Sequence, residues 1–252
     1  MTRPIEIGRF TIKDQHPAAG PLSVRDIFLH SSNVGAGLMA LEGGTERQLM
    51  FLARMGLTET IRTETGPVAQ PLLPQRWDRI ETVTIAYGHG IAVAPMQFAA
   101  AAAALLNGGR RVTPTYIATD KAMQGDAVLQ PATSAAIKEI MRLNVTSKDG
   151  TGRRADVAGY RVGGKTGTAE MPGENGYQRR SVIASFAGAM PMDRPRYLTL
   201  VTLFEPQPTP ETRGQITAAV NAAPVTARII TRIAPILGIL PRRLEGAEGK
   251  AD

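Results

Sequence analysis

Residues 160–170 read YRVGGKTGTAE and are the most informative stretch of the sequence. One lysine, Lys165, stands in a glycine-rich setting and is followed by Thr166 and Thr168. Because glycine has no Cβ, a ligand or a second backbone can approach such a segment closely. An ammonium beside hydroxyl donors suits an anionic group such as a carboxylate or a phosphate. An ordinary glycine-rich surface strand has the same composition, so the rest of the chain has to decide.

One interpretation of this stretch is a nucleotide-binding loop. From Gly159 the chain matches G-x-x-x-x-G-K-[ST], the phosphate-binding motif of nucleotide hydrolases. That motif requires a buried strand before the loop and a helix directly after it, with the helix N-terminus facing the phosphates. The preceding SKDGTGRRADVA is polar, and the following GTAEMPGENGYQ contains Pro172 and three glycines. Neither flank fits the motif, because proline and glycine do not open a helix there.

The other interpretation is the K-T-G element of a serine acyl-transfer site, which lies on a strand. Its companion, S-x-N, occurs far upstream as Ser31-Ser32-Asn33. With their flanks, the segments SSNVG, RWDRIETVTIAYGHGIAVAPMQFA and YRVGGKTGTAE resemble the class B penicillin-binding proteins, the division-type peptidoglycan D,D-transpeptidases. The resemblance extends over residues 10–237, and three motifs in order are far more specific than either tripeptide alone.

A third element of that family, the S-x-x-K tetrad with the nucleophilic serine, is not found in the printed sequence. None of the seven serines has a lysine three residues after it. In the family the tetrad precedes S-x-N by a few dozen residues. We therefore expect residues 1–252 to be a single, truncated transpeptidase domain, with the tetrad before Met1. The alternative is a non-catalytic module that serves as a binding scaffold in a cell-wall synthesis complex.

The resemblance implies an α+β fold of the penicillin-binding-protein and serine β-lactamase type, with an antiparallel sheet covered by helices. The family sheet has five strands, and its first two would be missing here, which would leave one sheet edge open. The ligands implied are peptidoglycan stem peptides and β-lactams, without a cofactor or a metal. Cell-division membrane proteins are implied as partners, at the periplasmic face of the inner membrane.

The resemblance also assigns roles to residues. In the family pattern Ser31 relays a proton to the leaving amine, and Asn33 hydrogen-bonds the substrate amide. Lys165 supports a positive field that keeps Ser31 ready for proton transfer. Thr166 and Thr168 bind the substrate carboxylate. Gly167 lets the strand lie against the acyl group, and the N–H of Thr168 contributes to the oxyanion hole. These roles require all of the residues to line one cleft.

Composition agrees with a globular domain rather than a disordered chain. Of the 252 residues, 43% are hydrophobic, which is enough for a sizeable core, and there is no cysteine to form disulfides or thiolate sites. His16, His30 and His89 have no metal-ligand spacing. The net charge of +7 is spread along the chain rather than gathered in a basic tract, so nucleic acid is not an expected partner. The N-terminus has no apolar core of a signal peptide.

Sequence patterns also predict the main elements. A capping box at Ser23 predicts the start of a helix that ends near Ser31 and Asn33. A second capping box is expected at Thr45. Residues 58–78 read as a long loop. Further helices are expected over 37–42, 48–55, 96–106, 133–143 and 215–237. Extended segments are expected over 9–13, 112–117, the K-T-G stretch, 181–189 and 197–204, the last two as a hairpin.

The lack of a tetrad in residues 1–252 gives a first prediction. This chain should not form a covalent acyl adduct with a penicillin, because acylation in the family uses the tetrad serine. Intact-protein mass spectrometry after incubation with benzylpenicillin measures the adduct directly. A stoichiometric mass increase would contradict the prediction and would point to Ser31 as the nucleophile.

Overall fold

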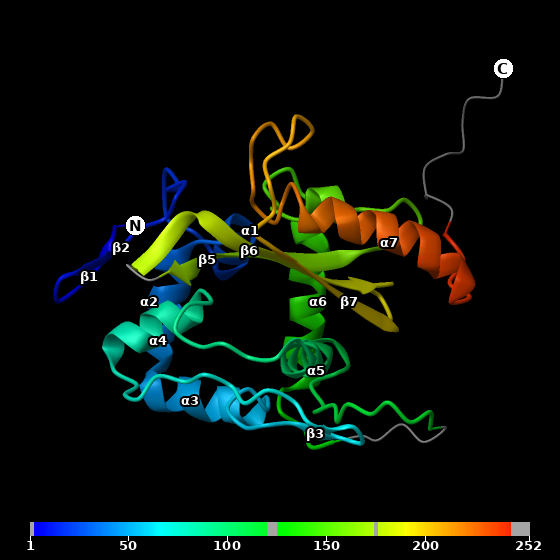
Figure 1. The fold of residues 1–252 in the computed structure, drawn as a ribbon, viewed down its shortest axis with the longest axis horizontal. Coiled ribbons are helices and arrows are strands. Elements are labelled where there is room, and N and C mark those ends of the chain that lie inside the picture. The colour runs from blue at the N-terminus through cyan, green and yellow to red at the C-terminus, as the bar shows by residue number, and fades with distance from the viewer. Residues whose placement is uncertain (1–2, 120–124, 174–175, 243–252) are drawn as a thin grey trace. The chain divides into compact units, whose positions relative to one another are not determined.

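The computed structural model describes residues 3–119, 125–173 and 176–242 (Figure 1). The chain divides into two compact units, residues 1–140 and 141–252. The division falls inside helix α6 (Pro131–Thr146). The prediction of a single domain over 1–252 therefore stays open, and each unit has hydrophobic clusters of its own.

The first unit is built mainly from helices, with two short hairpins. The hairpins pair antiparallel strands, β1 with β2 and β3 with β4. The bounds of these elements are β1 (Ile5–Ile7), β2 (Phe10–Ile12), α1 (Val24–His30), α2 (Asn33–Gly43), α3 (Thr45–Arg54), β3 (Arg62–Thr63), β4 (Gly66–Pro67), α4 (Arg79–Ala86) and α5 (Pro95–Leu106).

Two hydrophobic clusters stabilise the first unit. One packs the β1–β2 hairpin against α2 and α4, and its buried members are Ile5, Ile12, Val34 and Val83. The other lies around α5 and contains Met55, Ala101, Ala104 and Val128. A Cβ at Gly37 would lie 2.7 Å from Cγ1 of Val83, so helix α2 depends on this glycine for its close approach to α4.

The second unit is a three-stranded antiparallel sheet packed against helices. The strands are β5 (Gly163–Gly173), β6 (Gly176–Met190) and β7 (Tyr197–Phe204), in the order β5-β6-β7 (Figure 1). Helix α7 (Ala222–Ile236) packs on β6, β7 and the 3₁₀ helix η1 (Arg153–Ala155). Among the described residues, β6 is the one strand that pairs with β5 and with β7, so both outer strands have an open edge.

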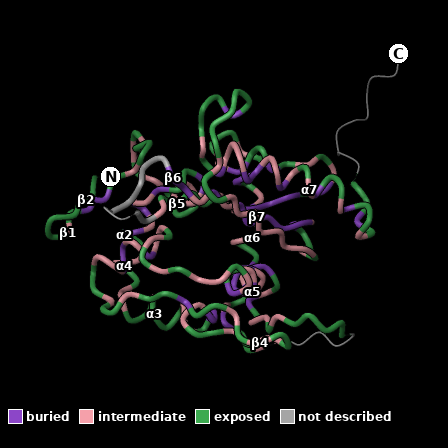
Figure 2. Tube along the Cα trace, viewed as in Figure 1, coloured by how far each residue is buried: buried purple, intermediate pink, exposed green. Residues whose placement is uncertain are grey.

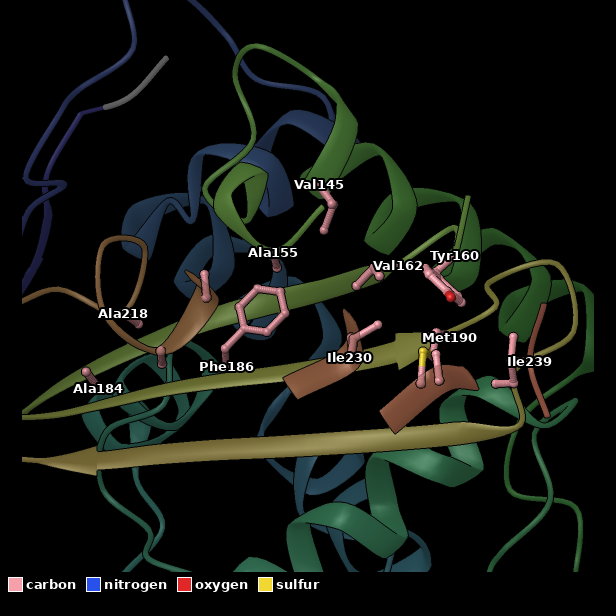
Figure 3. Close-up of a cluster of buried hydrophobic side chains, with 13 residues drawn as sticks. Val145, Ala155, Tyr160, Val162, Ala184, Phe186, Met190, Ala218, Ile230 and Ile239 are labelled. Carbon is pink, nitrogen blue, oxygen red and sulfur yellow. The ribbon is translucent and has the colours of Figure 1, made fainter. Parts of the chain in front are cut away.

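The core of the second unit lies between this sheet and α7. The ring of Phe186 projects from β6 into the middle of the cluster, among Val145, Ala155 and Ile230 (Figure 3). Phe186 and Ile230 are completely buried. In Figure 2 buried residues recur along β6 and α7, while α3 of the first unit has none.

Several sequence predictions are confirmed. Ser23 caps α1, because its hydroxyl accepts a hydrogen bond from the N–H of Asp26. Helix α5 starts with Pro95 at its first position, and β7 has the predicted bounds 197–204. The hairpin of β6 and β7 and the antiparallel sheet covered by helices are also as expected.

Other predictions are wrong in their boundaries. Helix α2 begins at Asn33 rather than near Gly37, so Asn33 starts a helix instead of ending one. The capping box predicted at Thr45 is wrong. Gly44 is the N-cap of α3 and makes no side-chain capping bond, and the hydroxyl of Thr45 instead hydrogen-bonds with that of Thr82. Residues 215–221, predicted as helix, are irregular chain and a turn before α7, so that Pro224 falls in the first helical turn, where proline is tolerated. Helix α4, which sequence patterns did not predict, starts at a capping box of Asp78 and Glu81.

Two findings concern the described part of the chain as a whole. No helix there is long and apolar enough to cross a membrane. In the same residues, no three or more His, Cys, Asp or Glu side chains are grouped so that they could hold a metal ion.

The buried position of Phe186 gives a second prediction. Phe186→Ala should lower the free energy of unfolding of the second unit by about 3–5 kcal/mol, because it leaves a cavity in the core. Hydrogen exchange of the β5–β7 amides measures this loss. Phe204→Ala is the matched control, since Phe204 is 67% exposed and its removal should change stability by no more than about 0.5 kcal/mol. Equal losses of stability from the two substitutions would contradict the buried position of Phe186 in the core.

Candidate active site

The predicted site residues fall into both units. Ser31 and Asn33 belong to the first unit, and Lys165, Thr166, Gly167 and Thr168 belong to β5 of the second. Each half can be described from its own contacts. The convergence of the two halves on one cleft stays a prediction.

Ser31 has an unusual backbone conformation. It ends α1 in the left-handed region, with φ 54° and ψ 46°, and its N–H bonds to the carbonyl of Phe28. For a residue other than glycine this conformation costs on the order of 1–2 kcal/mol. It turns the chain sharply between α1 and α2 and leaves Ser31 exposed. Strained residues of this kind occur often at functional sites.

The next two residues are fixed by a carboxylate from the N-terminal arm. The hydroxyl of Ser32 accepts from the N–H of Gly35, which makes Ser32 the N-cap of α2, and donates to Oδ2 of Asp14 at 2.6 Å. Oδ1 of Asp14 accepts from the N–H of Val34 at 3.0 Å. A carboxylate at a helix N-terminus is favourable, because it meets unpaired N–H groups and the positive end of the helix dipole. Asn33, half-buried, is thus held at the first position of α2.

Lys165 lies well inside β5, where it is paired with Ala187 of β6. Its Nζ donates to the carbonyl of Thr166 at 3.0 Å. The residue is half-buried, and desolvation of its ammonium lowers its pKa from the ordinary 10.5 to about 8. The nucleotide-loop interpretation is wrong, because the strand continues through Gly173 where that motif requires a helix.

The outer edge of β5 presents main-chain groups. The carbonyl of Gly164 accepts from Nδ2 of Asn144 at 2.8 Å, and that of Thr166 accepts from Lys165, so both are bonded to side chains rather than to β6. In an antiparallel strand the N–H and C=O of one residue point to the same side, and every second residue points the same way. The N–H of Thr168 therefore points to this edge too.

The two threonine hydroxyls have partners within the second unit. Thr166 Oγ1 donates to Thr151 Oγ1 at 2.8 Å, and Thr168 Oγ1 accepts from the N–H of Ala218 at 3.0 Å. Thr168 therefore keeps its own proton for a further acceptor, since a hydroxyl can accept and donate at once. At Gly167 a Cβ would meet nothing within 4 Å, so the space beside it is open.

A cavity of about 640 Å³ opens in the second unit, and it includes Thr151, the hydrogen-bond partner of Thr166. Thr151 forms part of its wall, together with Arg153, Arg154 and Val220. The carboxylate on the same wall, Asp156, is paired with Arg142 at 2.7 Å. The two exposed arginines give the wall a positive character that suits an anionic group.

Sequence reasoning missed the residues that hold the motifs in place. Asp14 precedes Ser32 by many residues, and Thr151 and Ala218 come from separate loops. Local patterns give no signal for such pairings. The buried Asn144 had one available signal, because it stands one residue beyond the predicted helix 133–143 and at helical spacing from the apolar Ile140 and Met141.

The sequence profile described as "Penicillin binding protein transpeptidase domain" matches residues 2–230. The chain belongs to this family. Its fold is accordingly the α+β transpeptidase fold, with an antiparallel sheet and covering helices, as the resemblance implied.

Several curated relatives are named as peptidoglycan D,D-transpeptidases. The probable peptidoglycan D,D-transpeptidase FtsI of Caulobacter vibrioides is 38% identical over 245 residues, which are 94% of this chain and 42% of that protein. Peptidoglycan D,D-transpeptidase FtsI of Escherichia coli K12 is 29% identical over 247 residues, 96% of this chain and 40% of that protein. The chain thus spans about two fifths of the length of these two relatives.

Solved structures agree with the family. The apo transpeptidase domain of penicillin-binding protein 3 from Burkholderia pseudomallei has a TM-score of 0.86 at 30% identity and covers 96% of this chain and 72% of that chain. Penicillin-binding protein 3 from Mycobacterium tuberculosis, complexed with ampicillin, has a TM-score of 0.82 at 25% identity, with coverages of 96% and 57%.

The lowered pKa of Lys165 gives a third prediction. Its side chain should titrate with a midpoint near pH 8, which lysine-selective NMR measures, and Lys165→Arg identifies the signal by removing it. The unfolded chain holds this proton up to about pH 10.5, so between pH 8 and 10.5 the folded state binds fewer protons. The contribution of Lys165 to the free energy of unfolding should therefore rise with pH across this window. A midpoint near 10.5 would contradict the burial of the ammonium.

Proposed function

We propose that this chain is the substrate-binding part of a penicillin-binding peptidoglycan D,D-transpeptidase domain. The observation that carries the proposal is the open edge of β5, where the K-T-G residues combine a desolvated ammonium, hydroxyls and an outward N–H. These are the groups that bind a carboxylate and a developing oxyanion. The positive cavity wall that includes Thr151, the partner of Thr166, supports an acidic peptide terminus as the ligand.

The proposed reaction is acyl transfer between two stem peptides. A serine oxygen attacks the carbonyl of the D-Ala-D-Ala bond, the terminal D-Ala leaves with a proton on its amine, and an amine of a second stem peptide takes the acyl group. β-Lactams would acylate the same serine. The attacking serine belongs to an S-x-x-K element, which residues 1–252 do not contain.

Proton transfer in this scheme depends on the S-x-N and K-T-G elements together. Ser31 would pass the proton to the leaving amine, and Asn33 would hydrogen-bond the substrate amide. With a pKa near 8, Lys165 changes charge close to neutral pH, which suits a group that supports proton relay through Ser31. The left-handed turn at Ser31 keeps its side chain exposed for this contact.

The remaining K-T-G residues would bind the substrate. The hydroxyls of Thr166 and Thr168 would hold the terminal carboxylate, and the open space at Gly167 would admit the peptide. The N–H of Thr168 would donate to the oxyanion, an interaction worth about 10²–10³ in rate. Cell-division membrane proteins are the proposed partners, at the periplasmic face of the inner membrane.

Peptide titration gives a fourth prediction and tests the function. Diacetyl-L-lysyl-D-alanyl-D-alanine should shift the NMR signals of Ser31 and Asn33 together with those of Lys165, Thr166 and Thr168, all with one Kd. One Kd follows because a single ligand would bridge both elements. The matched control is the same peptide with L-alanines, which should shift none of these signals at equal concentration.

Two results would contradict this function. Shifts confined to one of the two units would show that S-x-N and K-T-G do not share a ligand. No specific shifts at all would favour the alternative, a non-catalytic scaffold of a cell-wall synthesis complex.

A further inference from the structure

A hydrogen-bond network in the second unit connects a buried asparagine to the K-T-G strand. Asn144 is completely buried on α6, and its Nδ2 donates to the carbonyl of Gly164 at 2.8 Å. Its Oδ1 accepts from both the N–H of Thr151, at 3.0 Å, and the hydroxyl of Thr151, at 3.2 Å. Thr166 donates its hydroxyl proton to Thr151. One side chain thus joins the 150–152 turn to β5.

The turn around Thr151 has little freedom to move. A Cβ at Gly150 would lie 2.1 Å from the carbonyl oxygen of Asn144, so glycine is required there. The N–H of Gly152 bonds to the same carbonyl at 3.0 Å. Backbone and side chain of Asn144 therefore hold Thr151 at a fixed distance from Thr166, which is the condition for a precise positioning contact.

The direction of the hydrogen bonds matters for ligand binding. A hydroxyl has one proton, so while Thr166 donates to Thr151 it cannot also donate to a carboxylate. Oδ1 of Asn144 already receives the N–H of Thr151, so the Thr151 hydroxyl can leave Oδ1 without creating an unsatisfied buried acceptor. A small rotation of Thr151 then lets it donate to Thr166, which frees the proton of Thr166.

We propose that Thr151, held by Asn144, is a positioning residue that sets the direction of the Thr166 hydroxyl. Without an anion, Thr151 accepts the proton of Thr166. When a carboxylate is bound, Thr151 donates to Thr166 and directs the proton of Thr166 to the carboxylate. This inference rests on the proposed function, because it assigns Thr151 a part in recognising the peptide carboxylate.

Peptide binding tests the role of the Thr151 hydroxyl. Thr151→Val, which keeps the shape and removes the hydroxyl, should weaken binding of diacetyl-L-lysyl-D-alanyl-D-alanine about tenfold, while its C-terminal carboxamide changes less than twofold. Thr151→Ser should restore the carboxylate affinity to within about threefold of the parent chain. Thr146→Val is the matched control in the wall of the same cavity, since its hydroxyl bonds to the carbonyl of Arg142 on its own helix.

A second measurement decides the inference without any peptide. Three-bond couplings of the Thr166 methyl group should report one side-chain rotamer in the parent chain and in Thr151→Ser, and an average of rotamers in Thr151→Val. The proposed role of Thr151 would be overturned if Thr151→Val bound the carboxylate peptide as tightly as the parent chain does. It would also be overturned if Thr166 in Thr151→Val kept the single rotamer of the parent chain. If the parent chain binds neither peptide, the proposed function fails, and the couplings alone decide whether Thr151 positions Thr166.

Discussion

The pairing of β5 with β6 is the constraint on which the second unit depends. Its register places Lys165 opposite Ala187 and Gly164 opposite Gly188. A Cβ at Gly164 would lie 2.5 Å from both the carbonyl oxygen of Ala187 and the ring of Phe186, so the strand can approach the core only with glycine there. Since side chains alternate along a strand, this register also decides which face receives Lys165 and which receives the threonines.

The K-T-G strand is accordingly organised from both of its sides. On the core side, Phe186 and Ile230 bury apolar surface and hold β6 against α7. On the outer edge, Asn144 and the ammonium of Lys165 bond to carbonyls that no neighbouring strand in the described residues takes up. An edge strand held in this way keeps N–H groups available for a ligand, whereas a central strand would use them in its ladder.

The S-x-N element has a different physical basis, because it is a junction between two helices. Ser31 adopts a left-handed conformation, and the capping bonds of Ser32 and Asp14 supply the compensation at the start of α2. The glycines that follow do not end the helix, contrary to the local pattern. Gly35 and Gly37 lie inside α2, where a Cβ at Gly35 would be 2.6 Å from Ile27. Their small size serves the close packing of helices rather than a turn.

The sequence by itself determined the family, the K-T-G strand, the α5 helix and the β6–β7 hairpin, because motif order, apolar periodicity and proline position are local properties. It also named the candidate site residues, whose convergence on one cleft stays a prediction. Tertiary structure alone decided that Asn33 begins a helix, that Asp14 caps it, and that Asn144 and Thr151 hold Thr166. These contacts join residues from separate segments, and their hydrogen-bond geometry exists only after packing has brought the segments together.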